Sequence, residues 1–367
     1  MRKLASIQRI ERIDPIEGKD KIGLALVENW HVIVRYDQFL PGDLCVYVEI
    51  DSVLPEKPEF EFLRSKKFRI RTMKMSGVIS EGICFPLSIL PDNGGLPYNV
   101  GDDVTDLLGI VKFDEYGDEP GPKEEPKERS WIRRFLFRHK ITRPLAKRIW
   151  RGTQKERRGF PEEVERSDEI RCQNLDWEKM VAKGLRYEVR EKLDGQSGTY
   201  LLRRNKGLIR FFRPFEFVVA SRNIGLPRPD GSSWWEVAER YDVENVLKAL
   251  IKDHPWVCIQ GEVVGPGIQG NPYKLETKDL YCFNLIYPHY KVEGVKAEPL
   301  LNALGMKWVP MVDASFILPE TCDEMLDLAD GKSRIANVDR EGLVIRNYEN
   351  GVSFKAVSRS YLIRQGK

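Results

Sequence analysis

The sequence is poor in the residue types that mark several common kinds of site. It contains six cysteines and four histidines among 367 residues. No two cysteines form a C-x-x-C pair, which argues against a zinc site or a disulfide framework and favours buried free thiols. The four histidines form no cluster in the sequence, so they are a poor set for an enzyme based on acid–base catalysis.

Long apolar runs and a strong net charge are also missing. No stretch approaches the ~18 apolar residues of a membrane span, and the first residues, MRKLASIQRIERID, lack the apolar core of a signal peptide. We therefore expect a soluble, cytoplasmic protein with no membrane partner, and a monomer by default. The 59 Arg and Lys residues nearly balance 56 Asp and Glu residues, so a nucleic-acid surface requires local clustering of basic residues.

Residues 1–110 have the pattern of a small all-β module. IQRIERI, GLALVENWHVIV and DLCVYVEI are rich in β-branched and aromatic residues, and the turn sequences GKD and LPGD interrupt them. A module of this length favours an OB-fold β-barrel. Apolar and basic residues alternate from Phe68 to Arg71, so a strand there would place Arg69 and Arg71 on one face.

Residues 111–158 differ from both flanking regions. Residues 114–128, DEYGDEPGPKEEPKE, are acidic and rich in Pro and Gly, which predicts a linker. Residues 129–152 carry nine Arg and Lys residues, no acid and several interleaved aromatics. This stretch could bind RNA, or dock on the protein with its basic side solvated. A membrane surface is the third alternative, disfavoured because Pro144 breaks a continuous helix.

Residues 159–367 alternate between helical and strand patterns, which predicts an α+β domain. Residues 232–251 have helical spacing, with their apolar side formed by Trp235, Val237, Tyr241, Val246 and Leu250. Thr321 and Glu324 have the spacing of a capping box. VCIQGEVVG, LYCFNLIY, GLVIRNY and VSFKAV read as strands around these helices.

The string YEVREKLDGQSGTYLL contains the most reactive candidate, Lys192. A strand should end at Lys192, turn at Asp194-Gly195 and continue as a second strand. A lysine is a poor nucleophile while protonated, because its reference pKa is near ~10.4. It becomes one when a nearby cation, a metal or partial burial lowers that pKa. Alone, K-x-D-G also fits a surface lysine in a turn.

Four further segments follow K-L-D-G in a fixed order, and the set resembles the covalent nucleotidyltransferase superfamily of ligases and capping enzymes. KLDG resembles motif I of that superfamily, and IQGEVVG resembles motif III. LYCFNLIY is similar to motif IIIa, REGLVIR to motif IV and SFKAVS to motif V. Five segments in this order are a more specific pattern than any one of them.

One branch is more similar still: the ATP-dependent, nick-sealing RNA ligases with an N-terminal OB module. FPEEVERSDEIRCQNL resembles the entry segment of that branch, FEFVVASRN its motif Ia, and KKFRIRTMKMSGVISEGICFPL its OB module. The sequence ends soon after Lys355, with no room for the C-terminal OB domain of capping enzymes. The resemblance implies an OB-fold module at 1–110, the insert at 111–158, and at 159–367 an ATP-grasp-like adenylation domain of antiparallel sheets flanked by helices.

The resemblance also implies roles for individual residues. Lys192 would attack the α-phosphate of ATP and hold AMP, with Gly195 in the same nucleotide-binding motif. Glu191 would contact the adenine edge and Phe283 would stack on the ring. Glu262 would hold the ribose or a metal-bound water, and Asp194, Glu262 and Glu341 are the expected ligands of Mg²⁺ or Mn²⁺. The phosphate-binding residues would be Arg171, Arg222 and Lys355.

Phosphoryl transfer relies on in-line positioning and charge neutralisation, and Mg²⁺ is usually held by one or two carboxylates, waters and substrate phosphate. Separate strand-end carboxylates suit that use, although Glu262 and Glu341 also fit ordinary surface pairs. Motif V departs from the pattern of some ligases, because Ala356 and Val357 follow Lys355 in place of a second lysine. Arg359 is an open alternative for the missing cation.

Two further predictions come from the residues themselves. Asn350-Gly351 is a strong two-residue hairpin signal, which would place Arg346 directly opposite Lys355, with an anion between them. In the N-terminal module, a set of basic residues is expected to grip nucleic acid, although a solvated basic face is the alternative for each member. The set is Lys66, Lys67, Arg69, Arg71 and Lys74.

The sequence as a whole predicts an RNA ligase that seals 3′-OH and 5′-phosphate ends, with nicked RNA or RNA/DNA hybrid duplexes as its partners. A capping-type guanylyltransferase is the alternative within the same fold. An RNA-binding protein that kept the fold without catalysis is the alternative from another class. Substituting Lys192 distinguishes the last of these from an enzyme.

Overall fold

The computed structural model describes residues 3–91, 94, 96–113, 158–226 and 231–367. The chain divides into two compact units. Unit 1 contains Met1–Glu115, Asp168–Leu193 and Pro310–Lys367, and unit 2 contains Tyr116–Ser167 and Asp194–Val309. The predicted linker and basic stretch, 114–128 and 129–152, lie outside the described residues. Part of the predicted adenylation domain therefore belongs to the same compact unit as the N-terminal module. The sequence predicted these as separate, consecutive domains.

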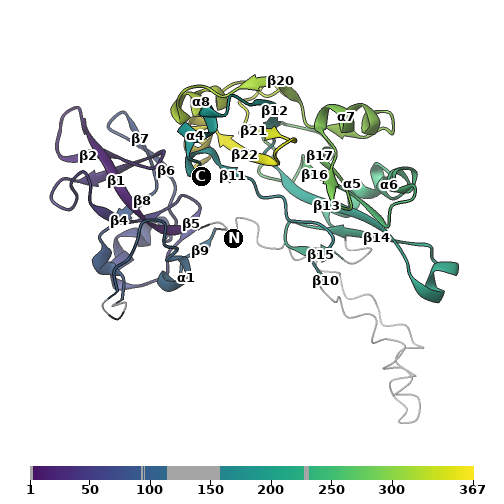
Figure 1. The fold of residues 1–367 in the computed structure, drawn as a ribbon, viewed down its shortest axis with the longest axis horizontal. Helices are drawn as coiled ribbons and strands as arrows, with labels where there is room; N and C mark the ends of the chain where they lie inside the picture. Colours follow the sequence, from purple (N-terminus) through teal and green to yellow (C-terminus); the bar gives the residue numbers. More distant parts are fainter. Residues whose placement is uncertain (1–2, 92–93, 95, 114–157, 227–230) are drawn as a thin grey trace, which may run out of the picture. The chain divides into compact units, whose positions relative to one another are not determined.

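The N-terminal part of unit 1 is an OB-fold half-barrel (Figure 1). Its five-stranded sheet has the order β3-β2-β1-β4-β8. The strands are β1 (Ala5–Ile16), β2 (Lys19–Val27), β3 (Trp30–Arg35), β4 (Leu44–Val48) and β8 (Ile83–Phe85). Strand β1 pairs with β4 before Ile10 and with β2 after it, with a register shift at that point. Such a shift bends the strand, so one long strand serves both sides of the curved sheet.

Shorter elements complete this module. They are β5 (Ser52–Val53) paired with β9 (Val111–Lys112), β6 (Thr72–Met75) paired with β7 (Val78–Glu81), the 3-10 helices η1 (Pro58–Lys66) and η2 (Leu87–Ile89), and α1 (Thr105–Leu108). Trp30, Tyr47 and Phe60 are the large buried side chains of its core. The predicted OB-fold is confirmed.

The remainder of unit 1 is a second five-stranded sheet, ordered β11-β22-β21-β12-β20. Its strands are β11 (Ile170–Arg171), β12 (Arg186–Lys192), β20 (Met311–Ile317), β21 (Gly342–Asn347) and β22 (Val352–Val357). The helical elements are η4 (Cys172–Asn174), α4 (Trp177–Ala182), α8 (Cys322–Ala329) and α9 (Arg359–Gln365). The sheet is antiparallel except for β11, which runs parallel to β22. The predicted antiparallel arrangement therefore holds with one short exception in this unit.

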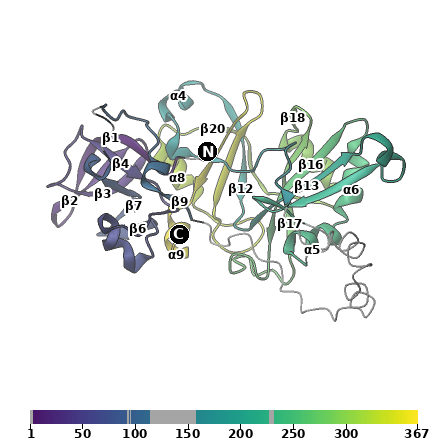
Figure 2. The ribbon, with the colours of Figure 1, turned by 90° about the horizontal axis from the view of Figure 1, so that it is seen from below.

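The OB-fold and this second sheet share one hydrophobic core within unit 1. Val357 at the end of β22 and Leu362 of α9 belong to the same buried cluster as the OB-fold residues Ile7 and Val48. Figure 2 shows α9 beside β6, and the Thr72 N–H donates to the Lys367 carbonyl over 3.1 Å. Burial of common apolar surface makes the OB-fold and the motif V strand parts of one folded body.

Unit 2 is built on an eight-stranded sheet with the path β10-β15-β14-β13-β16-β17-β18, and β19 pairs parallel with β17. The strands are β10 (Arg158–Gly159), β13 (Gln196–Arg204), β14 (Phe215–Ala220), β15 (Ile224–Leu226), β16 (Trp256–Val264), β17 (Asp279–Tyr287), β18 (Tyr290–Lys291) and β19 (Lys307–Trp308). The helical elements are η5 (Gly207–Phe211), α5 (Ser233–Arg240), α6 (Val243–Ile251) and α7 (Gly294–Asn302).

The predicted helix at 232–251 is two helices. Its apolar residues Trp235, Val237 and Val246 are buried as expected. Asp242 has φ 46°, however, so α5 ends before it and α6 begins after it. A left-handed residue cannot continue a right-handed helix. The burial pattern is therefore confirmed and the continuity is wrong.

Other local predictions have clear outcomes. The capping box at Thr321 and Glu324 starts α8, and all six cysteines are free and buried. No helix in the described part of the chain is long and apolar enough to span a membrane. The expected strand from Phe68 to Arg71 is wrong. Lys67 and Phe68 have φ 54° and 55°, and this left-handed backbone turns the chain instead of extending it.

Candidate active site

Lys192 ends strand β12 in unit 1, as predicted, and its side chain is held by an ion pair. The Lys192 Nζ lies 2.5 Å from Oε2 of Glu341. Both side chains are largely shielded, with 25% and 12% of their surface exposed. Glu341 directly precedes β21, whose first residue, Gly342, pairs with Lys192 across the sheet. Strand pairing thus joins the two segments that resemble motifs I and IV.

Gly342 is needed for this approach. A Cβ atom at this position would lie 2.3 Å from the Ala356 carbonyl oxygen, closer than real side-chain carbons come to backbone oxygens. A larger residue would have to push β21 away from β22, which carries Lys355. The glycine therefore keeps β12, β21 and β22 closely packed, with Lys192 on β12, Glu341 just before β21 and Lys355 on β22.

Glu191 precedes Lys192 and is almost completely buried, with 1% of its surface exposed. Its Oε2 accepts a hydrogen bond from the Arg334 N–H over 2.8 Å, whereas its Oε1 has no hydrogen-bond partner among the described residues. Burial raises the pKa of Glu191, and hydrogen bonds from Ser333 and Arg334 oppose that shift. A buried acceptor without a donor is unusual in a folded protein and suits a ligand that brings one.

Lys355 and Arg346 lie on one face of the β21–β22 hairpin, but the predicted register is wrong. Lys355 pairs with Val344 and Arg346 pairs with Ser353, because the turn takes four residues, 348–351, instead of two. The Asn347 side chain accepts a hydrogen bond from the Asn350 N–H and so holds the longer turn. The two cations are diagonal neighbours two positions apart.

The expected anions beside these cations are carboxylates of the protein. Lys355 Nζ lies 3.1 Å from Asp168 Oδ1, and Arg346 lies 2.9 Å from Glu169 Oε1. Asp168 also pairs with Lys112 over 2.8 Å. Asp168 and Glu169 were not predicted as site residues, although both stand in the segment VERSDEIRCQNL, which resembles the entry segment of the RNA ligases.

Arg171 is buried within unit 1, with 4% of its surface exposed. Its guanidinium pairs with Asp51 of the OB-fold over 3.0 Å, while Nε and the other terminal nitrogen have no hydrogen-bond partner among the described residues. Arg359, the open alternative for a second motif V cation, pairs instead with Glu81 of the OB-fold. The structure therefore places both arginines at contacts with the OB-fold.

In unit 2, Asp194 and Gly195 form the turn that leads into β13. The buried Asp194 donates its N–H to the Tyr273 hydroxyl over 2.7 Å. A Cβ on Gly195 would lie 2.4 Å from the Val263 carbonyl oxygen, so the turn can approach β16 only with glycine at this position. Tyr273 was not selected from the sequence, and no spacing pattern distinguishes it there.

Glu262 and Phe283 occupy neighbouring strands of the unit 2 sheet. Glu262 is paired with Ser197 on one side and with Tyr281 on the other. The pairing of β16 with β17 then shifts, because Gln260 pairs with Asn284 and Gly261 with Cys282. Phe283 is thus the extra residue of a β-bulge. Bulges reorient side chains next to binding sites, and both Glu262 and Phe283 remain partly exposed.

Arg222 and the metal ligands complete the predicted set. Arg222 is exposed in the turn between β14 and β15. Among the residues that the structure describes, no group of three or more His, Cys, Asp or Glu side chains is placed to hold a metal ion. Mg²⁺ in proteins usually takes part of its coordination shell from substrate phosphate and water.

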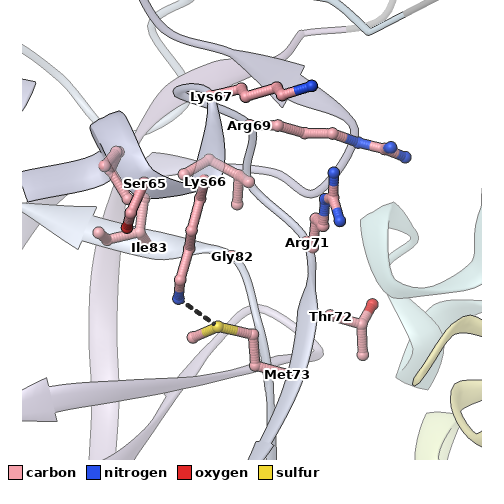
Figure 3. A pocket seen from close by; sticks show the side chains of 11 residues that line it. Ser65, Lys66, Lys67, Arg69, Arg71, Thr72, Met73, Gly82 and Ile83 are labelled. Carbon is pink, nitrogen blue, oxygen red and sulfur yellow. Dashed lines mark hydrogen bonds between the residues drawn. The ribbon is translucent and has the colours of Figure 1, made fainter. Parts of the chain in front are cut away.

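The basic residues predicted to grip nucleic acid lie around a pocket of about 310 Å³ in the OB-fold (Figure 3). Lys66, Lys67, Arg69 and Arg71 line it, and Lys74 is exposed on β6. Arg69 differs from the others, because it is buried, pairs with Asp51 over 3.5 Å and lies 3.5 Å from the Phe113 ring centroid. The other four form the exposed basic surface.

Comparisons with known proteins agree with this arrangement. Residues 185–357 match the family model described as RNA ligase, and residues 4–87 match one described as an OB-fold domain. A comparison with curated proteins found no match.

Solved structures of a Naegleria gruberi RNA ligase are similar along nearly the whole chain. Its structure with PPi is 29% identical with a TM-score of 0.78, covering 99% of this chain and 98% of that one. A mutant with ATP and Mn is 28% identical with a TM-score of 0.77, covering 100% and 98%. A mutant with AMP and Mn is 29% identical with a TM-score of 0.76, covering 98% of each chain.

These matches name the activity for residues 185–357 and the fold for residues 4–87, and the structural likeness extends over both. They agree with the order of motifs from Lys192 to Lys355 and with the observed OB-fold. The chain is therefore an RNA ligase with an N-terminal OB-fold module.

Proposed function

We propose that the protein is an ATP-dependent ligase that seals 3′-OH and 5′-phosphate ends in nicked duplexes containing RNA. Lys192 first becomes adenylylated, AMP then passes to the 5′-phosphate, and the 3′-OH finally attacks that phosphate and releases AMP. The likeness to an RNA ligase whose structures contain ATP and Mn, AMP and Mn, or PPi supports this sequence of events.

The ion pair between Lys192 and Glu341 is the observation that carries the proposal. In the first step, Lys192 Nζ forms a bond to the α-phosphorus while the bond from that phosphorus to the pyrophosphate oxygen breaks. The attacking nitrogen must first give up a proton. Glu341 is the carboxylate nearest to Nζ, at 2.5 Å, and is placed to receive it.

The surroundings of Glu191 support a role for this residue in recognising the adenine base. Its Oε1 is buried and without a partner among the described residues, and the exocyclic amino group of adenine is a donor that would satisfy it. A guanine presents a carbonyl oxygen at the corresponding position, and two acceptors facing each other in a buried site are unfavourable. This distinction favours ATP over GTP, and so a ligase over a capping enzyme.

The ion pair of Lys355 supports a role for this residue in binding phosphate. Its side chain is 12% exposed, and its ammonium group already binds an anion, Asp168. A phosphate oxygen can replace that carboxylate without leaving the cation unpaired. In unit 2, we assign Phe283 to stacking on adenine and Glu262 to the ribose or a metal-bound water. Arg222 is assigned to a phosphate because it is basic and exposed.

Individual carboxylates of this protein are suitable ligands for magnesium or manganese. Glu341 in unit 1, and Asp194 and Glu262 in unit 2, offer the hard oxygen ligands that these ions prefer. A divalent cation bound there would withdraw charge from the phosphate. Lys192 itself then remains as the nucleophile, held at the end of β12.

The RNA would be gripped in part by the basic surface of the OB-fold formed by Lys66, Lys67, Arg71 and Lys74. These residues are exposed around or beside the pocket of Figure 3. Phosphate contacts of this kind carry little sequence information and are sensitive to salt. Arg69 would act indirectly, because its ion pair with Asp51 fixes the backbone of the segment that carries this basic surface.

Labelling with α-labelled ATP or GTP in the presence of magnesium, followed by denaturing electrophoresis, tests the proposal. We expect label from ATP alone in the wild type and none in Lys192→Ala. Lys183→Ala, an exposed lysine of unit 1, is the matched control and should be labelled normally. Label from GTP would support the guanylyltransferase instead. No label in folded protein free of bound AMP would leave a non-catalytic RNA-binding protein.

A further inference from the structure

The loop that joins β13 and β14 in unit 2 exposes two adjacent phenylalanines. Phe211 is 70% exposed and Phe212 is 89% exposed, the highest value among the large apolar side chains that the structure describes. Single exposed apolar residues are ordinary on protein surfaces, but a contiguous pair at the tip of a projecting element indicates a binding surface. In Figure 1 this loop runs out beyond the sheet of unit 2.

The charge of the same loop is of one sign. Residues 203–213, RRNKGLIRFFR, contain five Arg and Lys residues and no Asp or Glu. The two at its base have structural partners: Arg203 pairs with Glu163 and Glu216, and Arg204 donates to the carbonyls of Lys252 and His254. The remaining three, Lys206, Arg210 and Arg213, are exposed.

The hydrogen bonds that fix the shape of this loop lie at its base. Asn205 donates its N–H to the Pro214 carbonyl over 2.9 Å and its side-chain amide to the Arg213 carbonyl over 2.8 Å. These bonds close the base of the loop. Above them, the Arg210 guanidinium lies 5.0 Å from the Phe211 ring centroid. The tip thus combines aromatic faces with cations on a fixed base.

We propose that the tip formed by Lys206, Arg210, Phe211, Phe212 and Arg213 binds unpaired nucleotides of the RNA substrate. The phenylalanine rings would stack on bases, and the cations would contact phosphates. This pairing of aromatic and basic groups is how proteins hold single-stranded nucleic acid without regard to sequence. Bases inside a duplex are already stacked, so the ligand is a single-stranded extension of the substrate outside the nicked duplex. The inference relies on the proposed function for the identity of the nucleic acid as RNA.

Equilibrium binding without ATP tests the inference, with a labelled nicked RNA duplex that carries a single-stranded uridine extension and the same duplex without it. We expect wild-type protein to prefer the extended duplex. Phe211→Ala/Phe212→Ala should weaken binding to the extended duplex by between about five- and a hundredfold. Its binding to the fully paired duplex should not change. Leu300→Ala, which removes another exposed apolar side chain of unit 2, is the matched control and should bind both duplexes as the wild type does.

The charged residues give a second readout. Arg210→Ala/Arg213→Ala should reduce the slope of log affinity against log salt by about 1.4 for the extended duplex, since each single-strand phosphate contact contributes about 0.7. Arg210→Lys/Arg213→Lys should restore the slope. All substituted side chains are exposed, so thermal unfolding should be unchanged in every variant, and so should labelling of Lys192 by ATP.

Three outcomes would overturn the inference. The aromatic variant could bind the extended duplex as tightly as the wild type, or Leu300→Ala could lose affinity equally. The aromatic variant could also retain RNA affinity while losing binding to phosphatidylserine vesicles, which would make the tip a membrane contact. Failure of the proposed function is distinguishable, because a wild type that takes no label from ATP but prefers the extended RNA would leave the tip's role intact.

Discussion

Replacing Arg359 tests whether the OB-fold is fixed to the motif V strand by buried charge. Arg359 begins α9, directly after the segment that carries Lys355. Its Nε lies 2.9 Å from Glu81 Oε2 and its terminal nitrogen 2.8 Å from Asp323. Glu81 is completely buried, and its other oxygen accepts a hydrogen bond from the Gln173 amide over 3.2 Å. Arg359→Met would therefore leave a buried carboxylate without its counter-ion.

The expected loss follows from that burial. Removing one partner of a buried ion pair costs about 3–5 kcal/mol, which corresponds to a fall in melting temperature of about 6–20 °C for a unit of roughly 200 residues. The matched control is Arg12→Met, because Arg12 pairs with Asp14 at 3.0 Å but with both side chains about half exposed. Such surface pairs contribute about 0–1 kcal/mol.

Thermal unfolding by circular dichroism, with urea titration for the free energy, measures both variants. Adding Glu81→Gln to Arg359→Met should recover part of the loss, because the uncompensated charge is then removed. Equal, small shifts in Arg359→Met and Arg12→Met would refute the reasoning. They would mean that water or other groups already solvate Glu81 and that the shared apolar core alone joins the OB-fold to the second sheet.

Three other substitutions have expected outcomes. Thr321→Ala should lower stability by about 1 kcal/mol by removing the cap of α8, and Thr321→Ser should not; equal urea midpoints would contradict this. Burial lowers the pKa of His31 below 6.5, so stability should be lost as pH falls through and below that value, where the unfolded state binds the proton more readily. His31→Asn should flatten this dependence in urea titrations between pH 5 and 8, and an unchanged slope would refute it. Burial raises the pKa of Glu191, so its charge destabilises the folded state increasingly as pH rises above 4.5. Glu191→Gln should therefore stabilise the free protein at neutral pH by about 0.5–2 kcal/mol while weakening labelling by ATP. A destabilised variant would show that the charge of Glu191 is not costly to the folded protein.

Local sequence signals predicted local structure well. The strand ending at Lys192, the turn at Asp194-Gly195 and the cap at Thr321 each depend on residues a few positions apart. The apolar pattern of 232–251 also predicted which side chains are buried. It did not reveal the break at Asp242, because a left-handed aspartate leaves the hydrophobic spacing almost unchanged.

Predictions that needed a long-range partner were less successful. Arg69 looked like a surface cation because its neighbours alternate, but Asp51 and Phe113 draw it into the protein. The register of Arg346 against Lys355 was wrong because the Asn347 side chain favours a longer turn. The grouping of residues from Pro310 onward with the OB-fold depends on contacts between apolar residues such as Ile7 and Val357, far apart in the sequence.

Lys192, Lys355 and the neighbouring Arg346 share one property that follows from those long-range partners. Lys192 is paired with Glu341, Lys355 with Asp168 and Arg346 with Glu169. Each carboxylate comes from a distant segment of unit 1. A partly buried cation without a counter-ion would be costly, so the free protein supplies its own anions. Under the proposed function, binding of ATP would exchange a carboxylate for a phosphate at Lys355 instead of creating a new buried pair. The net affinity would then depend on how readily Asp168 and Glu341 release these cations, and Glu341 would also be a ligand for a divalent cation.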